Sequence, residues 1–406
     1  MTILKDYQQF GGRHYETGTL HNILAHLGAK NPATGQPISE AMLLGISGGI
    51  TLGYFPFAYE GYTPHLAILT RNTFDPLQTL LDRLVLPHEV QQTTKPKLAE
   101  AKLAAALESG DVTMVWADMF SLPYKALGRQ DGYWAMLPLV IYGMDGEQVY
   151  IADQSSRPHL VNRDVFSQAR GRVKEDRYRL MTFSAPNPDH LPAAVQKGIW
   201  QCISLFTDAP PKGARHNFGF AAYQHWANLL TNSRNKQGWE RFFPAGSALY
   251  MALAGDTYQP GLFGWIATWG TGPDADRGTY ADFLQEAAVL LGKPAFNEVA
   301  AQFRQSASLW HELGNATLPD DVPLLRESRE LKLRRRQLSW ALGDEALPEI
   351  QAVQARLDEI KTIMAQSFPM SDSEVVAFRE NLRDHVLRLH DQELAAITHL
   401  QAVMAA

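Results

Sequence analysis

The chain is organised around one stretch near its N-terminus, Gly11-Gly12-Arg13-His14-Tyr15-Glu16-Thr17-Gly18-Thr19-Leu20. Its paired glycines are typical of a loop, and the pattern of residues 18–27 predicts a helix that follows this loop. Backbone N–H groups at the start of a helix stabilise negative charge. The sequence therefore predicts that His14 and Tyr15 begin a helix whose N-terminus favours an anion.

Composition limits the classes of function. The chain has 406 residues, of which 45% are hydrophobic and 20% charged, as in a globular protein of two or three domains. Its net charge of −6 argues against a general nucleic-acid or anionic-membrane binder. Cys202 is the only cysteine, so no intrachain disulfide forms. Residues 1–6 hold no apolar signal core, and no stretch approaches the roughly 20 apolar residues of a membrane helix, so we expect a soluble, cytoplasmic protein.

The first 185 residues mix strand and helix patterns. Short apolar runs at Leu66–Leu69 and Thr113–Ala117 predict strands. The segments Pro76–Leu86 and Lys97–Glu108 have helical periodicity, and Ser39–Leu44 predicts a short helix capped by its serine. This mixture predicts an α+β domain.

A hairpin is the strongest local signal. Asp145-Gly146 lies between two β-rich runs, Leu139–Tyr142 and Gln148–Ala152, and Asp-Gly favours a tight turn between antiparallel strands. The segment Arg177–Phe183 predicts a further strand that closes this region.

A change in composition marks a second domain. The segment Ala185–Pro192 contains three prolines and predicts a linker. Beyond it the chain is almost wholly helical: Tyr280–Leu291 carries an apolar face, and Ser371-Asp372-Ser373-Glu374 is a capping-box sequence. A terminal bundle of long helices is predicted over Leu324–Leu342, Ile350–Met364 and Glu374–Met404. We therefore predict two domains, residues 1–185 and residues 193–406.

Three motifs of the first domain resemble a known family. The opening stretch is similar to the first motif of the butirosin BtrH-type N-terminal domain, a family of papain-like acyltransferases. There the pattern is roughly Gly-Gly-x-His-Cys-x-Thr and the cysteine is the nucleophile, whereas Tyr15 stands at that position here. Residues 133–145 resemble the second motif, with Leu137 at the position of the family's histidine. Only the third motif, Val149–Asp153, keeps its functional residue, so the resemblance implies a degenerate triad.

The second domain carries a resemblance of its own. It is similar to the helical domain of unknown function that commonly follows the BtrH-type domain. The matching residues are Asn217-Phe218-Gly219-Phe220, Trp226-Ala227, Gly270-Thr271-Gly272, Arg277 and Tyr280–Ala287. The two resemblances together imply an α+β fold, with a papain-like N-terminal domain and a mostly helical C-terminal domain.

The two replaced residues change the chemistry that the resemblance implies. Papain-like acyl transfer needs a thiolate, an imidazole that activates it and a carboxylate that orients the imidazole. The phenol of Tyr15, with a pKa of about 10, is a poor acyl nucleophile near neutral pH, and Leu137 has no acid–base capacity. Tyr15 is either an oxyanion donor or proton shuttle, or it fills the space of the lost thiol and caps the helix. Asp153 either hydrogen-bonds Tyr15, binds a substrate amine or caps a turn.

Six residues are candidates for the site. The candidates for a catalytic role are Tyr15, His14, Glu16 and Asp153, and those for substrate binding are Asp118 and Tyr124. Residues 116–124 resemble the family's Asp-x-x-x-Leu-Pro-Tyr segment, and the alternative there is a strand end followed by a proline turn. His14 is equally compatible with a structural role.

The remaining signals are weaker. The glycine-rich run Gly45–Gly53 lacks a phosphate-loop or dinucleotide pattern and predicts close backbone approach beside the cleft. No histidine pair has metal-binding spacing, so we expect neither a metal nor a cofactor.

Cys202 lies in an apolar run and is expected to be buried. Arg334-Arg335-Arg336 either meets an acidic carrier protein or forms a solvated helix face.

The sequence supports two hypotheses of function. The first is a natural-product biosynthesis protein that binds a small-molecule or carrier-protein-bound acyl or aminoacyl substrate in an acyltransferase-like cleft. If active, it promotes cyclisation, aminolysis or hydrolysis without a cysteine nucleophile. The second is a catalytically inactive pseudoenzyme that acts as a binding or scaffold protein. Turnover and oligomeric state are left open, with a homodimer as one option.

Overall fold

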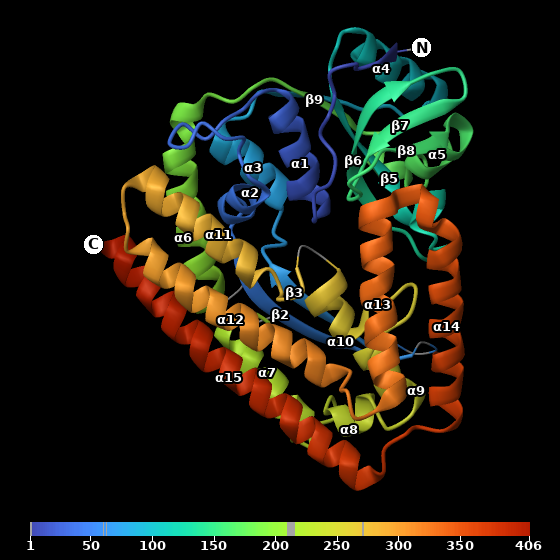
Figure 1. Cartoon of the computed structure of the whole chain (residues 1–406), viewed down its shortest axis with the longest axis vertical. Helices are drawn as coiled ribbons and strands as arrows, with labels where there is room; N and C mark the ends of the chain where they lie inside the picture. Colours follow the sequence, from blue (N-terminus) through green and yellow to red (C-terminus); the bar gives the residue numbers. More distant parts are fainter. Residues whose placement is uncertain (1, 60, 62, 209–215, 270–271) are drawn as a thin grey trace. The chain divides into compact units, whose positions relative to one another are not determined.

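The computed structural model describes residues 2–59, 61, 63–208, 216–269 and 272–406 (Figure 1). Gly270 and Thr271, which belong to one of the motifs of the second domain, lie outside the described residues. The fold is α+β, as the sequence predicts, with an antiparallel sheet in the N-terminal region and a helical C-terminal region. Within the described residues, none of the helices combines the length and apolar character that a membrane crossing requires.

The chain forms two compact units that are interleaved along the sequence. The first unit consists of Met1–Leu43, Leu77–Ala194 and Arg335–Ala352, and the second of Leu44–Pro76, Val195–Arg334 and Val353–Ala406. The helices α2 (Glu40–Ile46), α3 (Pro76–Leu84), α6 (Leu191–Thr207), α13 (Pro323–Leu342) and α14 (Leu347–Gln366) have residues in both units. The linear domain limits of 1–185 and 193–406 stay a prediction.

A seven-stranded antiparallel sheet forms the first unit, in the order β4-β9-β5-β6-β7-β8, with β1 also paired to β6. The strands are β1 (Thr2–Ile3), β4 (His88–Gln91), β5 (Thr113–Asp118), β6 (Met136–Met144), β7 (Gln148–Ala152), β8 (His159–Asn162) and β9 (Leu180–Phe183). The predicted hairpin consists of β6 and β7. In its turn, Asp145 Oδ1 accepts hydrogen bonds from the backbone N–H groups of Glu147 (2.8 Å) and Gln148 (2.7 Å). The predicted strands at Thr113–Ala117 and Arg177–Phe183 correspond to β5 and β9.

Helices cover this sheet and complete the core of the first unit. They are α1 (Tyr15–His26), α4 (Pro96–Glu108) and α5 (Arg163–Arg170). Buried side chains from both layers meet in one cluster that includes Leu107, Val115, Ile141, Ile151 and Phe166. The apolar strand residues read from the sequence are therefore the core of this unit.

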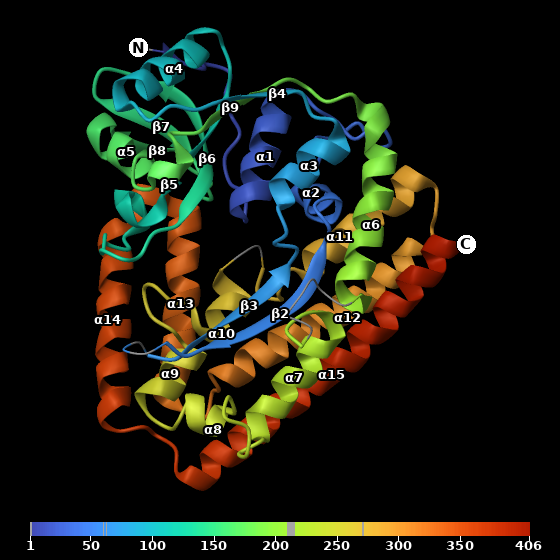
Figure 2. The same ribbon diagram turned by 180° about the vertical axis from the view of Figure 1, so that it is seen from behind.

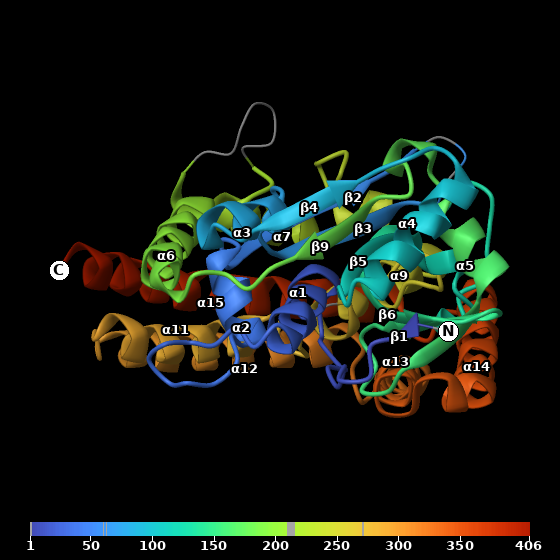
Figure 3. The same cartoon turned by 90° about the horizontal axis from the view of Figure 1, so that it is seen from above.

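The second unit combines a two-stranded antiparallel sheet with helices. The strands are β2 (Ile50–Phe57) and β3 (His65–Arg71), and the helices include α7 (Gly219–Thr231), α8 (Trp239–Phe242), α9 (Ser247–Leu253), α10 (Gly261–Phe263), α11 (Arg277–Leu291), α12 (Phe296–Thr317) and α15 (Asp372–Ala405). Figures 1 and 2 show α7, α12 and α15 side by side, and Figure 3 shows α11 next to α12. The predicted capping box starts α15, where Ser371 and Glu374 cap each other's backbone.

A fully buried ion pair and its hydrogen bonds join four helices of the second unit, α7, α11, α12 and α15. Arg277 on α11 donates from Nε to Glu393 on α15 at 2.7 Å. Glu393 also accepts hydrogen bonds from Tyr223 (2.6 Å), Ser306 (2.7 Å) and Trp310 (2.8 Å). Burial raises the pKa of Glu393, but Arg277 and these donors outweigh burial and hold the pKa below its usual value. A fully satisfied charge of this kind specifies one packing of the helices.

The glycine-rich run lies at the start of β2, a strand that the sequence did not predict because glycine weakens strand patterns. Gly49 has φ +70°, and a Cβ there would lie 2.7 Å from Tyr280 Cε2 and 3.1 Å from Cys202 Cβ. The backbone approaches its neighbours closely here, but the contacts serve packing inside the second unit, and the predicted place of this run beside the cleft stays a prediction.

Candidate functional site

Two glycines shape the loop that leads into α1. Gly11 and Gly12 have φ values of +90° and +100°, a region that favours glycine, and a Cβ on Gly12 would lie 2.9 Å from Gly18 Cα. The loop therefore folds back onto the first turn of its own helix. Tyr15 is the first residue of that helix, as the sequence predicts.

Glu40, at the start of α2, fixes this loop from the other side. Its Oε2 accepts a hydrogen bond from the backbone N–H of Arg13, and its Oε1 accepts one from the backbone N–H of His14, both at 2.9 Å. Oε1 also accepts the Thr17 hydroxyl at 3.0 Å. The carboxylate of Glu40 thus accepts the backbone N–H groups just before α1 and fixes the direction in which the chain enters the helix at Tyr15.

The same loop is tied to the segment that follows β7. The backbone N–H of Gly11 donates to the carbonyl of Ser155 at 2.7 Å. The side-chain amide of Gln154 donates to the carbonyl of Arg13, also at 2.7 Å. These bonds hold the start of α1 against the end of β7, so that Tyr15 and Asp153 belong to one site.

Asp153 lies at the centre of this site. Its Oδ2 is 2.7 Å from Lys125 Nζ and accepts the Tyr124 hydroxyl at 2.9 Å, and its Oδ1 accepts the backbone N–H of Gln154 at 2.8 Å. The side chains of Lys125 and Asp153 are only 13% and 3% exposed. Lys125 Nζ also lies 5.3 Å from the centre of the Tyr15 ring. A buried ammonium therefore contacts the carboxylate and lies over the ring of the phenol.

Electrostatics fix the protonation states at neutral pH. Burial raises the pKa of Tyr15 and Asp153 adds to the rise, against a smaller opposing effect of Lys125 and Arg335. Burial alone would raise the pKa of Asp153, but Lys125 and the hydrogen bonds to the carboxylate lower it overall. Burial would lower the pKa of Lys125, but Asp153 and Tyr15 raise it overall. The site therefore holds a charged Lys–Asp pair and an un-ionised phenol.

A second layer supports Tyr124 and the segment after Asp153. The ring of His159 stacks on Tyr124, with centroids 3.9 Å apart, and its Nδ1 lies 2.7 Å from Asp344 Oδ1. The carbonyl of Trp340 accepts hydrogen bonds from the hydroxyl (3.0 Å) and backbone N–H (2.8 Å) of Ser156. The end of α13 and the turn η6 (Gly343–Ala346) thus hold the strand end that carries Asp153.

The structure brings three of the six candidate residues together: Tyr15, Asp153 and Tyr124. His14 is the residue before α1, with its ring centroid 6.2 Å from that of Tyr15, and Glu16 lies in the first turn of α1. Both flank the site in sequence, and their catalytic roles stay a prediction.

Asp118 ends β5 and organises the turn that follows. Its carboxylate accepts hydrogen bonds from the Ser121 hydroxyl (2.6 Å) and the backbone N–H of Ala135 (3.0 Å). This is the strand end and turn that the sequence offered as the alternative to a substrate-binding role. Leu137 pairs with Ala117 in the sheet, as a strand residue.

Sequence reasoning missed Lys125 and the contribution of Arg335. Lys125 directly follows Tyr124 in the short 3-10 turn η2 (Pro123–Lys125), so a lysine beside a candidate site tyrosine was the available signal. Arg335 was expected on a solvated face or against a carrier protein, yet it is partly buried. It donates to the carbonyl of Lys125 at 3.4 Å and lowers the pKa of Tyr15.

Other features of the described residues bear on the chemistry. An open pocket of about 450 Å³ is lined by Pro123, Ala126 and Leu127 together with Gln168 and Gln351, and not by Tyr15, Lys125 or Asp153. The side chains of the described residues form no group of three or more metal-ligating residues. Cys202 is buried in the second unit, as predicted, and burial raises the pKa of its thiol to about 12.

Comparison with protein families agrees with the motifs. Residues 14–154 match the family described as butirosin biosynthesis protein H, N-terminal, and residues 167–322 match a domain of unknown function (DUF4872). No curated protein matches the chain. The first match contains Tyr15, Lys125 and Asp153, so the whole central part of the site lies in it. Residues 14–154 thus belong to the butirosin biosynthesis protein H N-terminal family, a papain-like family of natural-product biosynthesis, and are followed by this domain of unknown function.

Proposed function

We propose that this protein binds an acyl or aminoacyl substrate at Tyr15, Lys125 and Asp153 and promotes its aminolysis, cyclisation or hydrolysis without a covalent acyl-enzyme. One observation carries the proposal: the Lys125 ammonium is ion-paired with Asp153 at 2.7 Å and lies 5.3 Å from the centre of the Tyr15 ring. The family's connection with natural-product biosynthesis supports this class of substrate.

The protonation states decide the role of Tyr15. A raised pKa makes the phenol a worse nucleophile but keeps it a hydrogen-bond donor at neutral pH. Donors that are fixed before the reaction stabilise the negative charge that develops on a carbonyl oxygen during acyl transfer. Tyr15 supplies such a donor, and Lys125 adds a fixed positive charge beside it.

The bonds of the proposed step balance without an enzyme-bound intermediate. An amine of the acceptor attacks the carbonyl carbon of a thioester, the new C–N bond forms and the C–S bond breaks. The proton of the attacking nitrogen passes to the departing sulfur, while the Tyr15 hydroxyl keeps its own proton and donates a hydrogen bond to the carbonyl oxygen. With water as the attacking group, the same route gives hydrolysis.

We propose that the acyl group enters through the open pocket lined by Pro123 and Ala126, the residues that flank Tyr124 and Lys125 in the chain. The pocket's volume of about 450 Å³ lies in the range of small-molecule sites. We propose that the acyl group is presented either as a free thioester or on a carrier protein. His14 and Glu16, next to Tyr15 in the chain, are proposed to assist proton transfer.

A second candidate function, a binding or scaffold protein without turnover, is favoured by one observation. Three donors already occupy the Asp153 carboxylate, namely Lys125, Tyr124 and the backbone N–H of Gln154. A carboxylate satisfied in this way is a poor general base.

Turnover of acyl thioesters of N-acetylcysteamine with an amine acceptor tests the proposal. We expect Tyr15→Phe to lower kcat about 100-fold or more, because one oxyanion donor is lost. Tyr59→Phe, at a tyrosine that is 59% exposed, is the matched control and should leave kcat unchanged. Thioester binding with no turnover in either protein would favour the scaffold function, and equal turnover in wild type and Tyr15→Phe would contradict the role of Tyr15.

A further inference from the structure

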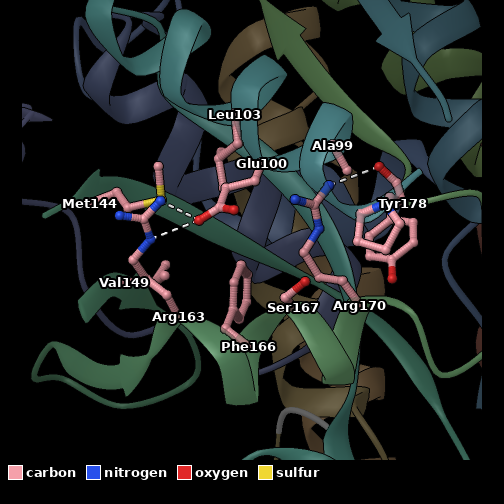
Figure 4. Close-up of a pocket in the computed structure, with 11 residues that line it drawn as sticks. Ala99, Glu100, Leu103, Met144, Val149, Arg163, Phe166, Ser167, Arg170 and Tyr178 are labelled. Atoms are coloured by element: carbon pink, nitrogen blue, oxygen red, sulfur yellow. Dashed lines mark hydrogen bonds and ion pairs between the residues drawn. The ribbon is translucent and has the colours of Figure 1, made fainter. Parts of the chain in front are cut away.

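A small cavity between α4 and α5 of the first unit is lined by a buried arginine (Figure 4). Arg170, on the last turn of α5, is only 2% exposed. One of its terminal nitrogens donates to the carbonyl of Tyr178 at 2.7 Å. Its Nε is buried and has no hydrogen-bond partner among the described residues. The guanidinium therefore has donor capacity that the fold leaves unused.

The positive charge of Arg170 also lacks a carboxylate partner within the described part of the chain. The acidic residue of the pocket, Glu100, is engaged elsewhere, because it accepts Arg163 Nε at 2.7 Å. Figure 4 shows this Glu100–Arg163 pair at one end of the pocket and Arg170 at the other. The centres of the Phe166 and Tyr178 rings lie 5.9 and 5.7 Å from the guanidinium carbon of Arg170, and they stabilise its positive charge only weakly.

Burial without a partner is costly for a charged group. Burial lowers the pKa of Arg170 to about 10, so the guanidinium is still protonated at neutral pH. Arg170 therefore carries a full positive charge in an apolar surrounding that includes Leu103 and Phe166. A counter-ion in the cavity would remove this cost.

The size of the cavity limits what it can hold. Its volume is about 20 Å³, slightly above the roughly 10–15 Å³ that one water molecule requires. A phosphate or a carboxylate is too large for this space, whereas a single atom of anionic charge is not. Ser167 also lines the cavity, as Figure 4 shows, and its hydroxyl provides a second donor.

We propose that this cavity binds one monoatomic anion of chloride size, held by the guanidinium of Arg170 and the hydroxyl of Ser167. The anion has a structural consequence for the turn that precedes β9. Arg177 and Tyr178 both adopt left-handed backbone conformations, with φ of +50° and +49°, and the carbonyl of Tyr178 is held by Arg170. Neutralising Arg170 keeps this strained turn in place. The stability of the first unit therefore depends on chloride.

The test is the unfolding midpoint of the full chain in sodium chloride and in sodium gluconate at equal ionic strength. Gluconate is too bulky for the cavity, so we expect a higher midpoint in chloride, with an increase that saturates as for one site. Ser167→Ala keeps the bond from Arg170 to Tyr178 and removes one donor. It should raise the half-saturating chloride concentration about threefold to tenfold. Arg304→Met, at an exposed arginine of the second unit, is the control and should behave as wild type.

A second measurement does not depend on any variant. Crystals grown in sodium bromide should show an anomalous bromide peak in the cavity beside Arg170. Equal unfolding midpoints in chloride and gluconate would overturn the proposal. A cavity that contains only water in the bromide crystals would do the same.

Discussion

Lys125 and Asp153 form a buried ion pair, with 2.7 Å between Nζ and Oδ2, directly beside the tyrosine that begins α1. In a papain-like triad an imidazole occupies the space between nucleophile and carboxylate and accepts a proton. An ammonium paired with a carboxylate accepts no proton, but it supplies a permanent positive charge. The Lys125–Asp153 pair therefore suits the site to stabilising negative charge on a substrate, and not to activating Tyr15 as a nucleophile.

No covalent acyl-enzyme is expected when the purified protein meets acyl thioesters. The phenol of Tyr15 has a pKa raised by burial, so its ionised fraction at pH 7 is below the roughly 0.1% of a free tyrosine. Intact-protein mass spectrometry after exposure to the thioesters measures this. A stable mass increase that maps to Tyr15 would reverse the assignment and make the phenol the nucleophile.

The acid stability of the protein should depend on Asp153. Its pKa in the folded protein is lowered, with burial raising it but Lys125 and the hydrogen bonds prevailing. The stabilisation is therefore present above the unfolded value near pH 3.9 and is lost as the pH falls through the folded value. We expect the free energy of unfolding in urea to fall less steeply between pH 5 and pH 3 in Asp153→Asn than in wild type.

Lys125→Met provides the matched variant for that experiment. Without the ammonium, burial of Asp153 dominates and raises the pKa of the carboxyl, so acid should no longer remove stability at this residue and should instead restore part of it. Removing one partner of a buried pair should also cost about 3–5 kcal/mol at neutral pH. Superimposable pH profiles for wild type and both variants would argue against the ion pair.

Cys202 is expected to be inert in the folded protein. Its Sγ donates to the carbonyl of Ile50 at 3.4 Å, it is fully buried, and burial raises the pKa of its thiol to about 12. Iodoacetamide should leave the native protein unmodified and alkylate it in urea, as read by mass. Cys202→Ser should leave thioester turnover unchanged. Loss of turnover in a folded Cys202→Ser protein would show that the nucleophile has moved to this position.

Arg277→Met should be far more destabilising than Arg304→Met. Arg277 and Glu393 are both fully buried, so the substitution leaves a buried carboxylate without its counter-charge and should cost about 3–5 kcal/mol. Arg304 and Asp282 form an ion pair in which both side chains are about half exposed, and its loss should cost less than about 1 kcal/mol. Urea unfolding measures both. The double variant Arg277→Met/Glu393→Gln should recover part of the loss, and similar costs for the two single variants would speak against the buried network.

Local signals in the sequence predicted much of the fold. The hairpin at Asp145-Gly146, the capping box at Ser371 and the helix that Tyr15 begins are all present in the structure. Each depends on interactions between residues close together in the chain, and such interactions can be recognised from sequence patterns. The strand β2 was missed because Gly53 and Pro56 disfavour a strand locally, whereas pairing with β3, a contact between separate segments, stabilises it.

The sequence by itself determined which residue types stand at the motif positions: a tyrosine for the cysteine, a leucine for the histidine and an intact Asp153. Only the tertiary structure decided what surrounds them. Lys125 lies 110 positions after Tyr15 and Arg335 lies 320 positions after it, yet both act on the same phenol. Spacing in the chain carries no information about such contacts, because they arise when helices and strands from distant segments pack around one core, and the charge of a site is the sum of what that packing brings together.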